Sequence, residues 1–210
     1  ATIDMSAASG IFTLTGGAGV DKITGGAGVD TIDGSGGDDI ITGGSGDDII
    51  TGGSGADIIT GGAGADTFKV DAGTDAVKDL ATTDILIISE NATANATVAI
   101  EFTATSDTVN HANNAVSKAV LSTDSDGATI DMSAASGIFT LTGGAGVDKL
   151  TGGAGADKID GSGGDDIITI AAAGKGDTDV MDGGANDDVL QLSTGAHTFA
   201  DDDKLKNIEE

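Results

Sequence analysis

The chain has 210 residues, with 35 acidic and nine basic side chains, so its formal net charge at pH 7 is −26. This charge excludes nucleic acid as a natural partner and disfavours direct binding to anionic membrane surfaces, because phosphate binding needs positive charge. The chain has five phenylalanines, no Trp or Tyr and no cysteine. Stacked aliphatic side chains are therefore the expected core, as in repeat proteins.

Residues 1–15, ATIDMSAASGIFTLT, predict two short strands around a small SAASG turn. The apolar residues are Ile3 and Met5 in the first strand and Ile11, Phe12 and Leu14 in the second. The segment is expected to cap or continue the repetitive structure that follows it.

Residues 16–69 are six consecutive copies of a nonapeptide, GGxGxDxUx, in which U is a large apolar residue. Glycines at the first, second and fourth positions predict a tight turn with positive φ angles. The last three residues predict a short strand whose central apolar side chain points inward. Two nonapeptides, eighteen residues, complete one coil, so turns two repeats apart stack roughly 4.8 Å from each other. The inward residues of this array and of a second one described below are Ile23, Ile32, Ile41, Ile50, Ile59, Phe68, Leu150, Ile159, Ile168, Met181 and Leu190.

The sixth position of every repeat is an aspartate, and the coil places these carboxylates above one another. Neighbouring acids, Asp38, Asp47, Asp165 and Asp187, add to the repulsion, and no lysine follows the row of carboxylates. A cation between the turns is predicted to resolve this repulsion. Carboxylates and turn carbonyls form an all-oxygen ligand set, which suits Ca²⁺. Aspartate is also a common turn residue, but turn preference alone does not explain its recurrence at every sixth position.

The predicted calcium ligands are of two kinds. The carboxylate ligands are Asp21, Asp30, Asp39, Asp48, Asp57, Asp66, Asp148, Asp157, Asp166, Asp179 and Asp188. The turn residues of the first array with predicted ligand carbonyls are Gly16, Gly25, Gly34, Gly43, Gly52, Gly61, Ala18, Ala27, Gly36, Ser45, Ser54 and Ala63. One ion between each pair of turns two repeats apart gives about seven ions in the chain. Zinc is disfavoured because cysteine is absent and His111 and His197 lie far from any acidic cluster.

Residues 70–127, the spacer, form a different kind of sequence with predicted strands at 84–88 and 96–103. A short helix is predicted over 113–121, with Val116, Val120 and Leu121 on one face. Two glycosylation triplets begin at Asn91 and Asn95.

Residues 128–142 repeat 1–15 without change, and both segments are predicted to be calcium-free β coils because they lack the aspartate repeat. The repetition extends further: 1–42 recurs at 128–169 with three differences, a period of 127 residues. The second array, 143–191, slips by four residues at 170–173 and is predicted to be the weaker calcium block. Residues 192–210 are interpreted as a polar edge of a truncated chain.

The two arrays resemble the RTX family, the repeats-in-toxin proteins that Gram-negative bacteria export by type I secretion. The resemblance implies an all-β fold, a right-handed parallel β-roll that is disordered at low cytosolic calcium and folds outside the cell. It also implies that sixth-position aspartates and turn carbonyls bind calcium. Lys175, Asp177 and Asn186 replace glycines of the family pattern, so distorted or empty sites are expected there.

Three functions stay open. The long internal repeat and the wealth of Ala, Thr and Gly favour a structural module of a secreted bacterial cell-surface protein, a surface layer or a repetitive adhesin. Its partners would be calcium ions, copies of itself in a lattice, or other surface components. The alternative is the secretion and folding appendage of an RTX enzyme or toxin. Ice binding is a third reading, because Thr24, Thr42 and Thr60 align on one face, although threonine is also a common exposed strand residue.

Catalysis within the chain is not expected, because it contains neither HExxH nor GxSxG. No run of eighteen apolar residues occurs, so membrane insertion is not expected either. The absence of an initiating Met and of a signal peptide favours a segment of a larger secreted protein.

Overall fold

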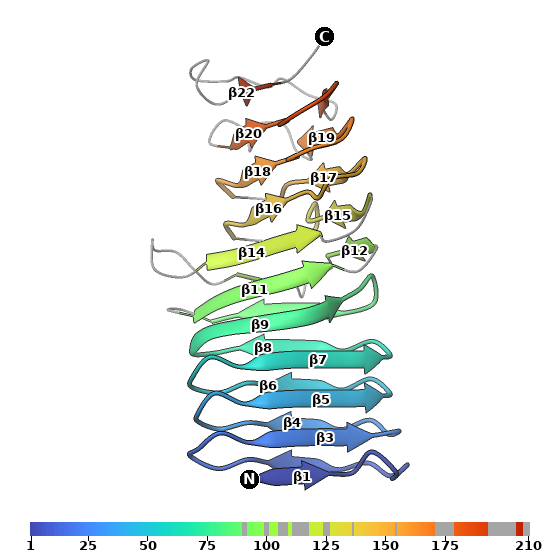
Figure 1. Cartoon of the computed structure of the whole chain (residues 1–210), viewed down its shortest axis with the longest axis vertical. Coiled ribbons are helices and arrows are strands. Elements are labelled where there is room, and N and C mark those ends of the chain that lie inside the picture. The colour runs from blue at the N-terminus through green and yellow to red at the C-terminus, as the bar shows by residue number, and fades with distance from the viewer. Residues whose placement is uncertain are drawn as a thin grey trace.

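Short parallel strands wind around one narrow core in a computed structural model of the chain, forming an elongated stack with the two termini at opposite ends (Figure 1). The structure describes residues 1–89, 92–98, 101–104, 109–110, 118–123, 127–135, 137–153, 155–170, 179–192 and 205–207. These residues form strands, turns and bends without any helix. The all-β parallel solenoid expected from the nonapeptide is confirmed.

Three parallel sheets make up the wall of the solenoid, and one of them runs along its whole length. The eleven-stranded sheet contains β1 (Thr2–Asp4), β3 (Lys22–Gly26), β5 (Ile40–Ser45), β7 (Ile58–Ala63), β9 (Gly73–Leu80), β11 (Ala92–Val98), β14 (Lys118–Thr123), β16 (Thr140–Thr142), β18 (Lys158–Asp160), β20 (Val180–Asp182) and β22 (Leu205–Lys206). The six-stranded sheet contains β2 (Thr13–Thr15), β4 (Thr31–Asp33), β6 (Ile49–Thr51), β8 (Thr67–Val70), β10 (Ile85–Ile88) and β13 (Val109–Asn110). The five-stranded sheet contains β12 (Glu101–Thr103), β15 (Thr129–Asp131), β17 (Lys149–Thr151), β19 (Ile167–Ile170) and β21 (Val189–Leu192).

The strand register confirms the coil of two nonapeptides. Ile23 lies opposite Ile41, and Ile41 lies opposite Ile59, so partners are eighteen residues apart. The same spacing holds on the other wall, where Ile32 pairs with Ile50. Because neighbouring coils repeat the same residue at each level, identical side chains stack in columns along the solenoid axis.

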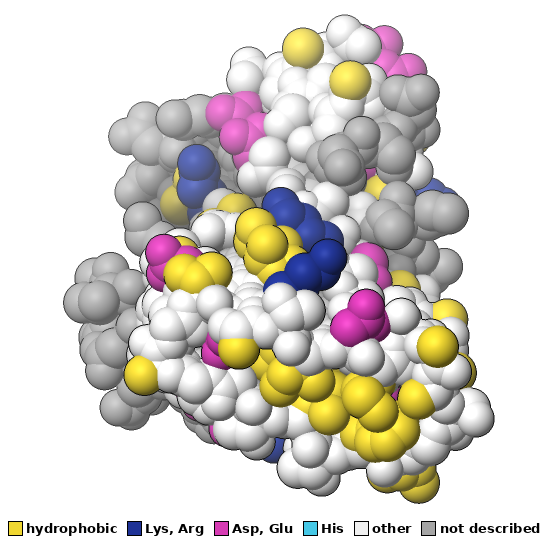
Figure 2. Space-filling model, turned by 60° about the horizontal axis from the view of Figure 1, so that its bottom comes forward, with side chains coloured by type: hydrophobic (Ala, Val, Ile, Leu, Met, Phe, Trp, Pro, Cys, Tyr) yellow, Lys and Arg dark blue, Asp and Glu magenta, His cyan; other side chains and the backbone are white. Residues whose placement is uncertain are grey.

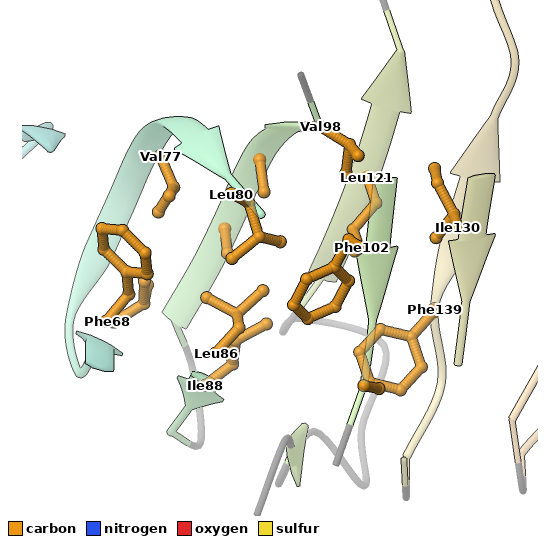
Figure 3. Close-up of a cluster of buried hydrophobic side chains, with 14 of the residues drawn as sticks. Phe68, Val77, Leu80, Leu86, Ile88, Val98, Phe102, Leu121, Ile130 and Phe139 are labelled. Atoms are coloured by element: carbon orange, nitrogen blue, oxygen red, sulfur yellow. The ribbon is translucent and has the colours of Figure 1, made fainter. Parts of the chain in front are cut away.

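The core consists of these columns. Ten of the eleven predicted inward side chains are fully buried, and Leu190 is partly buried near the C-terminal end. Figure 3 shows the column continuing through the middle of the molecule, where Phe68, Leu86, Phe102 and Phe139 point into the space between the walls. Aliphatic stacking, supplemented by a few phenylalanines, thus replaces a conventional globular core.

The spacer residues enter the same sheets as the arrays. Strand β9 pairs with β7, and β10 pairs with β8, so the wall passes from residue 70 onward without a break. The predicted strand at 84–88 is confirmed by β10. The predicted single strand at 96–103 is wrong, because β11 ends at Val98 and β12 lies in a different sheet.

The helix predicted over 113–121 is also wrong where the structure describes it. Val120 and Leu121 belong to β14, and Leu121 pairs with Ala96 of β11. The hydrogen bonds that this segment forms with the parallel sheet outweigh its weak helical pattern. Val116 and the preceding part of this prediction lie outside the described residues.

The repeated segment 1–15 forms the two predicted strands in both of its copies, β1 and β2 in the first and β15 and β16 in the second. The first copy is terminal, since β1 and β2 are the edge strands of their sheets. The second copy is internal and is flanked by β12 and β14.

Candidate metal centre

In several repeats the first glycine is required by close packing between coils. A methyl group on Gly34 would collide with the carbonyl oxygen of Gly52 in the next coil and would lie 2.5 Å from Oδ2 of Asp39. Gly34 has no left-handed φ, so the predicted positive φ at the first position is wrong there. The small space beside this glycine is bordered by a carbonyl oxygen of one coil and a carboxylate oxygen of another.

Positive φ angles occur instead at the second and fourth positions. Gly44 has φ of 124° and Gly46 has φ of 120°. Ser35 adopts the left-handed region at the second position and Asn186 adopts it at the fourth. Asparagine tolerates this conformation better than most residues, so Asn186 fits its turn even though it departs from the nonapeptide.

The sixth-position aspartates form a continuous ladder that joins successive coils. The backbone N–H of Asp39 donates to Oδ1 of Asp57 at 2.8 Å, and the N–H of Asp48 donates to Oδ1 of Asp66 at 2.8 Å. All eleven predicted aspartates are buried, with at most 4% of each side chain exposed. The repulsion predicted between stacked carboxylates is therefore partly relieved by backbone amides, which insert between one carboxylate and the next.

The second oxygen of many ladder aspartates has no donor among the residues that the structure describes. Buried Oδ2 atoms without a hydrogen-bond partner in the described residues belong to Asp30, Asp39, Asp48, Asp57, Asp75 and Asp166. A buried carboxylate oxygen without a donor carries a large desolvation cost. A cation is the natural partner for such an oxygen, particularly in a row of carboxylates that carries no lysine.

The donor set fits a hard cation. At several first glycines a carboxylate Oδ2 and a carbonyl oxygen from the neighbouring coil border the same space, as for Gly25 with Asp30 and Gly43. Oxygen-only sites of this kind suit Ca²⁺, which accepts flexible sets of six to eight ligands. No group of three or more acidic, histidine or cysteine side chains is placed to hold a metal ion in the part of the chain that the structure describes. Backbone carbonyls would therefore supply most of the ligands.

Burial raises the pKa of several carboxyl groups of the ladder. Desolvation raises the pKa of Asp48, Asp66 and Asp166 to about 6 and the pKa of Asp75 to about 7. Neighbouring ladder carboxylates add to the increase, whereas the backbone N–H of the preceding coil opposes it. The buried row therefore resists carrying its full negative charge unless positive charge is brought to it.

The ladder extends beyond the residues predicted from the sequence. Asp57 donates its backbone N–H to Oδ1 of Asp75 at 3.1 Å, and Asp66 donates to Oδ1 of Asp84 at 3.0 Å. Both acids are buried spacer residues, each eighteen positions after one of the last two predicted aspartates of the first array. The nine-residue spacing of aspartate persists there after the paired glycines are lost, and that spacing is the signal that identifies them.

The fifth-position acids do not lie in the ladder. Asp38 accepts the backbone N–H of Ala56 at 2.9 Å, and Asp47 accepts that of Ala65 at 2.9 Å. Both acids are exposed, so solvent screens the repulsion that was predicted from them. Their role in the structure is to cap an amide of the following coil.

The four-residue slip leaves the ladder of the second array in register. Asp157 donates its N–H to Oδ1 of Asp179 at 2.8 Å, and Asp166 donates to Oδ1 of Asp188 at 2.9 Å, each across 22 residues. The spacing between paired ladder aspartates is thus 22 residues across the slip instead of 18, and Ile170, the first residue of the slip, belongs to β19 (Ile167–Ile170). Lys175, Asp177, His111 and His197 lie outside the described residues.

The described part of the chain contains no helix that is both long and apolar enough to span a bilayer.

A model of the RTX calcium-binding nonapeptide repeat matches four segments, 13–41, 42–77, 140–169 and 173–196, which together exceed half of the chain. The second segment ends beyond Asp75, in agreement with the longer ladder. Neither the curated proteins nor the solved structures contain a match to the chain.

Proposed function

Because the chain belongs to the RTX calcium-binding nonapeptide-repeat family, we propose that it is a calcium-dependent structural module of a secreted bacterial cell-surface protein, such as a surface layer or a repetitive adhesin. RTX repeats occur in secreted bacterial proteins and bind calcium. The observation that carries the proposal is the row of buried carboxylate oxygens that have no donor among the described residues. Their charge is tolerated only when ions neutralise it, so the module folds where calcium is abundant.

A structural role is further supported by the way the chain repeats itself. Residues 1–42 and 128–169 are nearly identical, and each copy contributes strands to the eleven-stranded sheet, β1, β3 and β5 from the first and β16 and β18 from the second. Duplication of this kind lengthens a solenoid without adding a new type of site. We propose a non-catalytic module that holds about seven ions, one between each pair of stacked turns.

The threonine row considered for ice binding is in register, since Thr24 pairs with Thr42 and Thr42 pairs with Thr60. These side chains are only partly exposed. The adjacent outward column contains Lys22 and Ile40, which interrupts a regular hydroxyl surface. The structural proposal therefore has stronger support.

Circular dichroism during calcium titration tests the proposed function. In excess EDTA we expect a largely disordered chain, and we expect β signal to appear cooperatively as calcium rises to roughly 10⁻⁴–10⁻³ M, the range of extracellular modules. Each turn supplies only half of a site, so binding free energy becomes folding free energy. A full β spectrum in EDTA that millimolar calcium leaves unchanged would contradict the proposal.

A further inference from the structure

The second residue of the nonapeptide turn takes one of two backbone arrangements. In the turn that contains Asp157, the N–H of Gly153 donates to Oδ2 of Asp157 at 2.8 Å, and Gly153 has no left-handed φ. The turn that contains Asp148 has the same bond, from the N–H of Gly144 at 2.7 Å. Such a turn is closed, because the amide takes the oxygen that a cation would use.

Other turns are open, because their second residue is left-handed and its amide does not bond the aspartate of the turn. Gly26 is the counterpart of Gly153 in the long repeat. Gly26 has φ of 138°, and Oδ2 of Asp30 has no donor among the described residues. Gly44 likewise has φ of 124°, and Oδ2 of Asp48 lacks a donor in the same part of the chain. Nearly the same sequence therefore adopts both arrangements.

Two turns have a serine at the second position, and the residue that ends the preceding strand holds each of them open. Ser35 has φ of 74° and Ser162 has φ of 72°, a conformation that is costly for residues other than glycine. The N–H of Ser35 donates to Oδ1 of Asp33 at 2.8 Å, and the N–H of Ser162 donates to Oδ1 of Asp160 at 3.1 Å. Asp33 ends β4 and Asp160 ends β18. An amide that is held in this way is not available to the sixth-position carboxylate.

The ladder carboxylates of these two turns are hidden from solvent. Oδ2 of Asp39 and Oδ2 of Asp166 are buried without a donor in the described residues. On the face that Figure 2 turns toward the viewer, acidic side chains appear only in small separate patches. The partner of a buried Oδ2 must therefore come from its own turn or from an ion. Strained backbone at a binding site is a sign of pre-organisation, and a pre-organised site binds more tightly because less has to be ordered on binding.

We propose that the second-position amide controls the affinity of each calcium site, and that Asp33 and Asp160 are positioning residues that keep two sites open by accepting this amide. A closed turn must give up a hydrogen bond to a charged oxygen before an ion binds, and such bonds are about twice as strong as those between neutral groups. The open sites at Asp39 and Asp166 therefore fill at lower calcium concentration than the two closed sites. The proposal rests on the proposed function, because it concerns the same calcium sites.

Calcium titration of the full chain, followed by circular dichroism, tests the role of Asp160 with two variants of equal charge. Asp160→Asn retains an oxygen acceptor for the N–H of Ser162 and should fold at nearly the wild-type calcium midpoint. Asp160→Ala releases this N–H to Oδ2 of Asp166 and should raise the midpoint severalfold. In an Asp166→Asn background the same substitution should cause a much smaller increase, because the site that it controls is already weakened.

The reverse change tests the proposal in a closed turn. Thr151 lies two residues before Gly153, as Asp160 lies two residues before Ser162. Thr151→Asn supplies an acceptor for the N–H of Gly153, because an asparagine side chain readily bonds the backbone two residues on. It should lower the calcium midpoint below that of Thr151→Val, the control without an acceptor. If Asp160→Ala does not fold at any calcium concentration, this pair of variants decides.

Failure of the proposed function and failure of this inference give different results. A wild-type chain without calcium-dependent β signal contradicts the calcium module and the inference with it. When wild type does fold with calcium, three results overturn the inference alone. They are one shared midpoint for the two Asp160 variants, an equal effect of Asp160→Ala in the Asp166→Asn background, and a midpoint of Thr151→Asn no lower than that of Thr151→Val.

Discussion

The two oxygens of a ladder aspartate have different surroundings, and this difference assigns them different roles. Oδ1 of Asp66 accepts the amide of the preceding coil, whereas Oδ2 of Asp48 is buried without a donor in the described residues. Asparagine retains a carbonyl oxygen for the amide but cannot supply the second anionic oxygen. Substitution by asparagine therefore separates the hydrogen-bonding role from the cation-binding role.

Asp48→Asn should raise the calcium midpoint of folding by about tenfold or more, because an interaction that involves a charged group is worth roughly 1.5–3 kcal/mol and about 1.4 kcal/mol corresponds to a factor of ten. Asp75→Asn should act in the same way, although Asp75 lies in the spacer, because it belongs to the ladder. Asp71→Asn removes the same charge from an exposed spacer position and should change the midpoint little. Calcium titration followed by circular dichroism measures all three. Equal effects would mean that the ions only screen bulk charge.

Acidification should partly replace calcium. The pKa of Asp48 is raised by burial to about 6 and that of Asp75 to about 7, so the metal-free fold binds protons more tightly than the unfolded chain does. Its stability is then greatest below the unfolded value near 3.8 and declines as pH rises through 6 to 7. In EDTA, β signal should increase when pH falls from 7.5 to 5. Loss of β signal over this interval would contradict the raised pKa values.

At the scale of a single repeat, glycine serves two purposes that the sequence alone does not separate. The second-position Gly44 has φ of 124°, and a methyl group there would collide with the carbonyl of Gly26. The fourth-position Gly19 has no left-handed φ, and a methyl group there would meet nothing within 4 Å. Gly19 lies in the first repeat of the array, whereas the fourth-position Gly46 of an internal repeat has φ of 120° and a methyl group there would collide with the carbonyl of Gly28. Glycine is therefore indispensable in an internal turn and replaceable in the first one.

Gly44→Ala should raise the calcium midpoint severalfold or prevent folding, because left-handed backbone alone costs an alanine about 1–2 kcal/mol and the collision adds to this cost. Gly19→Ala is the matched control and should fold at nearly the wild-type midpoint. Both can be followed by circular dichroism in calcium. A Gly44→Ala chain that folds like wild type would show that the coils separate more easily than their packing indicates.

The four-residue slip in the second array is predicted to weaken its calcium binding. Deleting 170–173 and introducing Lys175→Gly and Asp177→Gly in the full chain restores an unbroken nonapeptide array. We expect the calcium midpoint of the second array to fall, because fewer residues then have to be ordered between paired ladder aspartates. Hydrogen exchange on strands β19 to β21 resolves this array from the first. An unchanged or higher midpoint would identify the slip as an accommodated feature.

The sequence allowed the coil, its register and the inward columns to be predicted, since a strict nine-residue period specifies all three. It did not reveal that the wall continues through the spacer. Asp75 with Val77 and Asp84 with Leu86 keep the sixth and eighth positions, but the paired glycines that mark a repeat are gone. The close approach at the first glycine was likewise hidden, because glycine in a sequence does not distinguish positive φ from tight packing.

For the whole molecule, two opposing effects decide folding. Burial of the continuous aliphatic core favours the folded chain, whereas repulsion within a net charge of −26 disfavours it. Specific ions in the turns and general ionic strength relieve this conflict differently. Salt screens exposed acids such as Asp38, but it does not reach the buried Oδ2 oxygens. Magnesium dehydrates reluctantly and demands near-octahedral geometry, so it suits carbonyl-rich turns poorly.

We therefore expect the radius of gyration of the chain to fall when calcium is added to a sample from which a chelator has removed it. Small-angle X-ray scattering measures this compaction. Magnesium chloride at the same concentration, and sodium chloride at the same ionic strength, should leave the chain expanded. Equal compaction by all three salts would mean that screening of the net charge is sufficient for folding.

The amide-to-carboxylate bonds of the ladder all run in the same direction along the chain. In each of them the amide belongs to one coil and the carboxylate to the coil that follows it in sequence. The amide of Asp39 is held by Asp57, a residue of the following coil, as the amide of Asp148 is held by Asp166. An ordered coil thus presents acceptors to the coil that precedes it in sequence. Order is expected to be transmitted from later coils toward the N-terminus, and cutting the chain on the C-terminal side of a coil should loosen that coil more than cutting on its N-terminal side.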